Sequence, residues 1–224
     1  DPRVQVVPLQ MKYPQGGEKQ LVAAVIGRQV PAPPAIPVNV GAIVQNVATA
    51  YAVYQAVMKH KPLFERYTTV SGQALSQSAN YLVRMGTPFA NLVELCGGMP
   101  DGDSKVLAGG PMMGKAVVSL DVPVCKGTNA VTVLSGADAH RGQVQACIRC
   151  GKCVDACPMG LEPYLLATLS ARGMYDRAER EQIVSCIACG SCQFTCPSHR
   201  PILDNILIGK GRVMANIKSR NSKK

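Results

Sequence analysis

The sequence contains no tryptophan, and aromatic residues make up only 4% of its 224 positions. Proteins that bind single-stranded nucleic acid stack bases on aromatic side chains, so this shortage argues against such a function despite a formal net charge of +10. No run of eighteen apolar residues occurs, so no transmembrane helix is predicted, and nothing resembles a signal peptide. An apolar content of 47% and a charged content of 17% are typical of a globular protein and not of a disordered one.

Cysteine is abundant, and eight of the ten cysteines form two copies of one spacing, C-x2-C-x2-C-x3-C-P. This spacing is typical of bacterial ferredoxins, in which three close thiolates bind one [4Fe–4S] cluster and the fourth binds the neighbouring cluster. The first predicted cluster is held by Cys147, Cys150, Cys153 and Cys196. The second is held by Cys186, Cys189, Cys192 and Cys157. Two adjacent one-electron carriers indicate an electron relay.

Other uses of these cysteines fit the spacing less well. Zinc needs four ligands, usually supplied by separated C-x2-C pairs, and disulfide frameworks are typical of short secreted chains. Gly151 and Gly190 follow the second cysteine of each run, where a positive φ would turn amide groups toward sulfur. Cys96 and Cys125 are predicted to be buried free thiols that act as small apolar side chains. Unpaired cysteines and labile clusters favour a reducing compartment, the cytoplasm.

Patterns along the chain predict an α+β multidomain protein. Helices are predicted over residues 21–26, 48–59, 88–95, 162–172, 175–184 and 201–217, and strands over 42–47, 64–70, 81–85, 105–108 and 130–134. We divide the chain into an α/β region (1–60), a β-rich module (61–118), a connecting segment (119–145), a helical cluster domain (146–212) and a basic tail (213–224). The basic tail could contact anionic lipid or an acidic partner, or remain solvated.

Several blocks resemble the C subunit of the Rnf electron-transport complex. These blocks are residues 13–21 (YPQGGEKQL), 109–114 (GGPMMG), 126–129 (KGTN), 150–161 (CGKCVDACPMGL) and 189–201 (CGSCQFTCPSHRP). In that family a flavin domain similar to the complex I flavoprotein precedes a β-grasp soluble-ligand-binding (SLBB) module and a two-cluster ferredoxin domain. The resemblance implies that residues 1–60 are the end of the flavin domain, and that the whole of the other two domains follows.

The resemblance also implies cofactors, partners and a location. Glu18 would lie near flavin and nicotinamide, and Asn46 and Thr49 near FMN; the alternatives are a helix-first-turn acid for Glu18 and strand-end or cap positions for the other two. The partners would be ferredoxin-like and membrane subunits, with ferredoxin and NADH exchanging electrons through the complex. The protein would be peripheral, on the cytoplasmic face of the cell membrane. Because the glycine-rich flavin loop is absent from this chain, we expect a piece of a longer protein that alone binds FMN and NADH poorly.

Two other functions share the cysteine pattern. A flavin and iron–sulfur protein of bacterial microcompartments, which reduces cobalamin, has the same domain order. Alternatively, the clusters could be structural, with the SLBB module as the working part.

Overall fold

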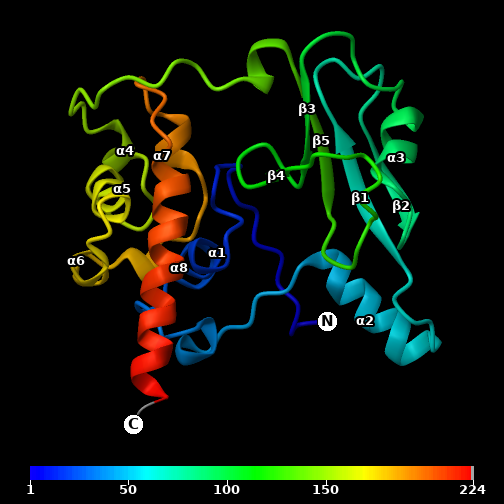
Figure 1. The fold of residues 1–224 in the computed structure, drawn as a ribbon. Coiled ribbons are helices and arrows are strands. Elements are labelled where there is room, and N and C mark those ends of the chain that lie inside the picture. The colour runs from blue at the N-terminus through cyan, green and yellow to red at the C-terminus, as the bar shows by residue number, and fades with distance from the viewer. Residues whose placement is uncertain (223–224) are drawn as a thin grey trace. The chain divides into compact units, whose positions relative to one another are not determined.

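The computed structural model describes residues 1–222 and divides the chain into two compact units (Figure 1). The first unit combines residues 1–44 with the segment from residue 145 onward, and the second comprises residues 45–144. Lys223 and Lys224 of the predicted basic tail lie outside the described residues. Within residues 1–222, no helix has both the length and the apolar character needed to cross a membrane.

The first unit is helical. Its elements are α1 (Glu18–Ile26), the 3-10 helix η1 (Pro37–Val40), α4 (Lys152–Asp155), α5 (Pro163–Ala171), α6 (Tyr175–Arg180), the 3-10 helix η3 (Ile183–Ser185), α7 (Ser191–Phe194) and α8 (Ile202–Asn221). Helices α5 and α8 pack against each other, and Leu166, Ile183 and Ile206 are fully buried in their shared core. Several cluster-run cysteines join this core, so the helices position the cysteine loops.

The second unit is built on a five-stranded sheet. One helix precedes the strands in the sequence, a second lies between β2 and β3, and a 3-10 helix follows the last strand. Its elements are α2 (Val47–Lys59), β1 (Glu65–Ser71), β2 (Ala79–Arg84), α3 (Phe89–Leu95), β3 (Ser104–Ala108), β4 (Lys115–Ala116), β5 (Ala130–Ser135) and the 3-10 helix η2 (Gly136–Ala139). The strand order is β2-β1-β5-β3-β4. The β1–β5 pair is parallel and the other pairs are antiparallel.

The core of the sheet unit lies between α3 and one face of the strands. Phe89, Leu92 and Val93 of α3 join Val70 of β1 and Val131 of β5 in one buried cluster. Strand β5 comes from the segment predicted to be a connection, yet it lies at the centre of the sheet. That segment therefore contributes to the core of the module.

Most predicted helices and strands are found within a few residues of their expected bounds, but two predictions are wrong. Residues 42–46 form no strand, and Val47 begins α2 because the Asn46 side chain accepts hydrogen bonds from the Ala48 and Thr49 amides at the helix start. The helix predicted over 175–184 ends at Arg180. Gln182 then has a left-handed backbone (φ 60°), and the turn that follows buries Ile183.

Candidate metal centre

The two cysteine runs have the same local backbone. Gly151 (φ 77°) and Gly190 (φ 83°) have the predicted positive φ, and each precedes a single helical turn, α4 or α7. Cys153 lies in α4 and Cys192 in α7. The fourth cysteine of each run follows its helix at the next turn, so the run wraps around one space while its last thiol is directed to another.

A second matched feature of the runs is not evident from the sequence. Arg149 (φ 55°) and Ala188 (φ 59°), each just before the second cysteine, also have left-handed backbones. This conformation is costly for residues with a Cβ, so surrounding structure must hold it. Neither residue is a glycine, so the sequence did not signal a left-handed backbone there. Their equivalent positions in the two runs were the only hint.

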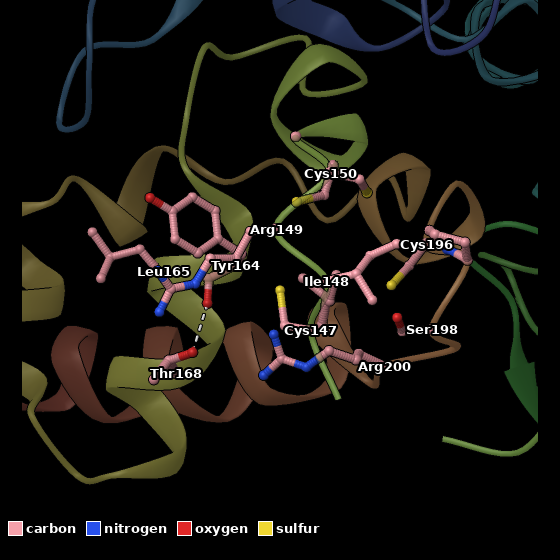
Figure 2. A pocket seen from close by; sticks show the side chains of 14 residues that line it. Cys147, Ile148, Arg149, Cys150, Tyr164, Leu165, Thr168, Cys196, Ser198 and Arg200 are labelled. Atoms are coloured by element: carbon pink, nitrogen blue, oxygen red, sulfur yellow. Dashed lines mark hydrogen bonds between the residues drawn. The ribbon is translucent and has the colours of Figure 1, made fainter. Parts of the chain in front are cut away.

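The first cavity contains the first predicted set of four cysteines. Cys147, Cys150 and Cys153 line it together with Cys196 from the second run, and its volume is about 460 Å³. Figure 2 shows Cys147, Cys150 and Cys196 around this space with Arg149 and Arg200. The Thr168 hydroxyl, also in the lining, donates to the Tyr164 carbonyl at 2.8 Å.

The second cavity contains the other four cysteines. Cys186, Cys189 and Cys192 line it with Cys157 from the first run. It is much tighter, about 20 Å³, and the rest of its lining is apolar, including Leu166, Leu203 and Ile206. The folded chain thus brings all eight predicted cysteines together in the two crossed sets.

The donor set of each cavity suits an iron–sulfur cluster. Four thiols with no nitrogen or carboxylate ligand among the described lining residues match the Cys₄ set that holds a [4Fe–4S] cluster. Among residues 1–222, no group of three or more His, Cys, Asp or Glu side chains is arranged to hold a metal ion. The thiols instead line the walls of the two cavities.

Burial changes the acidity of the thiols. Desolvation, with a smaller contribution from nearby thiols, raises the pKa of Cys192 from 9.0 to about 12. Desolvation also raises the pKa of Cys186 and Cys153. These thiols are therefore protonated in the metal-free protein at neutral pH, and metal binding must release their protons.

Hydrogen bonds surround the second cavity. The Ala188 amide donates to Cys186 Sγ and the Leu161 amide to Cys157 Sγ, both at 3.4 Å. The Tyr13 hydroxyl donates to the Cys189 carbonyl at 2.5 Å, and Lys210 Nζ donates to the Cys186 carbonyl at 2.6 Å. Groups outside the cysteine runs thus fix the loop that supplies the ligands, as second-shell contacts do in metal sites.

The predicted flavin residues lie elsewhere. Glu18 is in the first turn of α1 in the helical unit, whereas Asn46 and Thr49 are at the start of α2 in the sheet unit. Asn46 is a helix cap in this structure. Cys96 and Cys125 are free cysteines; Cys96 is buried as predicted, whereas Cys125 is exposed, so the prediction of burial is wrong there.

Three family models match successive parts of the chain. The Nuo51 FMN-binding domain matches residues 1–55, the SLBB domain residues 67–116 and the 4Fe-4S dicluster domain residues 141–197. The mixed fold thus consists of an FMN-domain remnant, an SLBB module and a dicluster ferredoxin region. The dicluster match covers the cysteine runs up to Pro197.

Curated relatives match most of the chain. The chain is 41% identical over 221 residues to the C subunit of the Na(+)-translocating ferredoxin:NAD(+) oxidoreductase complex of Acetobacterium woodii. This match covers 99% of the chain and 50% of the relative. The chain belongs to the family of C subunits of ion-translocating oxidoreductase complexes.

Other members of this family match over shorter stretches. The C subunit of the proton-translocating ferredoxin:NAD(+) oxidoreductase complex of Clostridium ljungdahlii is 45% identical, over 79% of the chain and 38% of the relative. The C subunit of the ion-translocating oxidoreductase complex of Rhodobacter capsulatus is 42% identical, over 94% of the chain and 40% of the relative. The chain spans half or less of the length of these three relatives.

Proposed function

We propose that this chain relays electrons through two [4Fe–4S] clusters, within a complex that couples electron exchange between ferredoxin and NAD to ion transport. The observation that supports this proposal most strongly is the crossed arrangement of the cysteines. Each cavity takes three thiols from one run and one from the other. Two clusters held in this way would be neighbours in one small helical unit, and neighbouring carriers are what a relay requires.

The residues that line the two cavities support an assignment of the ligands. Cys147, Cys150, Cys153 and Cys196 hold the first cluster. Cys186, Cys189, Cys192 and Cys157 hold the second. When bound, such clusters supply reversible one-electron chemistry. The chain's own residues position the thiols, donate amide hydrogen bonds to sulfur and, around the second cavity, exclude water with apolar side chains. The narrow walls there must spread to admit a cluster.

The whole protein supplies the rest of the function. We propose that the longer protein binds FMN through the domain whose end matches residues 1–55, with Glu18 near flavin and nicotinamide. Asn46 and Thr49 would contribute near FMN through the α2 start that Asn46 caps. The partners are ferredoxin-like and membrane subunits, and the location is the cytoplasmic face of the membrane. The names of the relatives support this function over cobalamin reduction.

Metal analysis tests the number of clusters. Anaerobic reconstitution should give about eight iron and eight sulfide per chain, as two [4Fe–4S] clusters require. Cys125, which is exposed and lies outside both runs, supplies a matched control: Cys125→Ser should retain the full iron and sulfide content. Colourless protein that contains zinc would contradict the proposal.

A pair of variants tests the crossed ligands. Replacing Cys186, Cys189 and Cys192 together by alanine should leave one cluster of about four iron, held by the first set. In that background Cys196→Ala should remove the remaining cluster, whereas Cys157→Ala should not. If the two substitutions have the opposite effects, each run binds its own cluster and the crossed assignment is wrong.

A further inference from the structure

Lys210 of α8 makes a part-buried contact with the second set of cysteines. Its Nζ atom donates a hydrogen bond of 2.6 Å to the carbonyl of Cys186, which is the first ligand of that set and lies 24 residues earlier in the sequence. The bond holds the ammonium group against the backbone of the loop that carries the Cys186 thiol.

The two cavities differ in the charges around them. Arg149 and Arg200 line the first cavity. Among the described residues that line the second, none is charged, and apart from its four thiols the lining is apolar. A charge acts more strongly where surrounding side chains exclude water. An ammonium group bonded to the Cys186 carbonyl, on the loop that lines this cavity, therefore has more effect than it would on an open surface.

We propose that Lys210 raises the reduction potential of the cluster held by Cys186, Cys189, Cys192 and Cys157. Reduction adds one electron, and hence one negative charge, to the cluster. An adjacent cation stabilises this more negative state, just as it favours the ionised form of a nearby acid. The hydrogen bond to the Cys186 carbonyl holds the ammonium in place and makes Lys210 a positioning residue for the ligand loop. This inference rests on the proposed two-cluster function.

The test is a redox titration of the reconstituted chain, with dithionite as reductant and electron paramagnetic resonance as the readout. Lys210→Met should shift the midpoint potential of one cluster to a more negative value and leave the other unchanged. The expected shift is about a tenfold change in the reduction equilibrium, which is about 59 mV for a one-electron couple. Lys210→Arg should restore the wild-type potential. Lys210→Gln gives a second neutral variant if Lys210→Met does not fold.

Two matched controls separate local charge from other effects. Arg149→Gln removes a cation beside the first cavity and should shift the other midpoint. Tyr13→Phe removes a neutral donor to the same ligand loop, at the Cys189 carbonyl, and should shift the second midpoint less than loss of Lys210 does.

The outcomes that would overturn the inference are distinct from failure of the relay. Unchanged midpoints in both neutral Lys210 variants, or equal shifts of both clusters, would refute a local effect of Lys210. So would a shift in Tyr13→Phe as large as that in Lys210→Met. A wild-type chain that assembles no clusters would overturn the proposed function together with this inference.

Discussion

Two glycines in helix α8 have opposite surroundings and predict opposite effects of the same substitution. Gly209 is buried against α5, where an added Cβ would lie 2.0 Å from Ser170 Oγ and 3.1 Å from Ile183 Cδ1. Gly211 is exposed, and an added Cβ would meet nothing within 4 Å. We predict that Gly209→Ala destabilises the helical unit and that Gly211→Ala stabilises it.

The magnitudes follow from helix propensity and packing. Alanine is more favourable than glycine inside a helix by about 0.8–1.0 kcal/mol, and Gly211→Ala should gain that amount. Gly209→Ala gains the same, but overpacking a core costs about 1–3 kcal/mol. Ser170 cannot move away freely, because its hydroxyl donates to the Leu166 carbonyl at 2.8 Å, and losing that bond costs about 1 kcal/mol more. The net loss in the free energy of unfolding is about 1–3 kcal/mol.

Urea denaturation followed by far-ultraviolet circular dichroism would compare the two variants with the wild type. Hydrogen exchange of the α8 amides would confirm that the change lies in the helical unit. Ser170→Gly in the Gly209→Ala background removes the side chain that clashes and should recover part of the loss. If Gly209→Ala proves as stable as Gly211→Ala, close packing of α5 on α8 at this point is refuted.

Three further predictions concern caps, contacts and thiols. Asn46→Ala should lower the free energy of unfolding by about 1 kcal/mol even without flavin, because it removes the cap of α2, whereas Asn46→Asp should keep the cap; thermal unfolding distinguishes them. Tyr13→Phe should cost about 1 kcal/mol and speed hydrogen exchange at residues 11–17, and unchanged exchange would show that the bond to Cys189 does not form in solution. Because burial raises the pKa of Cys192 from 9.0 to about 12, the folded metal-free protein holds that proton more tightly than the unfolded chain does. Its melting temperature should therefore fall between about pH 9 and 12, and fall less in Cys192→Ala.

Local sequence signals predicted much of the fold and the cysteine sets. Helix α1 ends at Ile26, where the following Gly27 gave a clear limit, and α2 ends at Lys59, as its alanine-rich pattern predicted. The cysteine spacing predicted the sets that line the two cavities, because the runs themselves shape the backbone around each space. The strand predicted over residues 42–47 was wrong because an apolar run alone does not distinguish a strand from a helix entry capped by Asn46.

Contacts between distant residues were not predictable in the same way. The bond from Tyr13 to Cys189 joins residues 176 positions apart, and only the folded unit brings them together. The same holds for Lys210, whose place in the sequence suggested only a basic helix end. Gln182 has a left-handed backbone without being glycine, so the end of the preceding helix had no sequence signal.

The position of β5 limits how this protein can be cut into pieces for study. A fragment that stops at residue 116 or 118, where sequence similarity to the SLBB domain ends or the predicted module closes, loses Ala130–Ser135. Strands β1 and β3 would then each lose a hydrogen-bonding neighbour, and Val70 and Val106 would lose apolar packing partners. Unpaired strand edges with exposed apolar side chains favour aggregation. Expression boundaries for this module should therefore fall after Ala139, the buried end of η2.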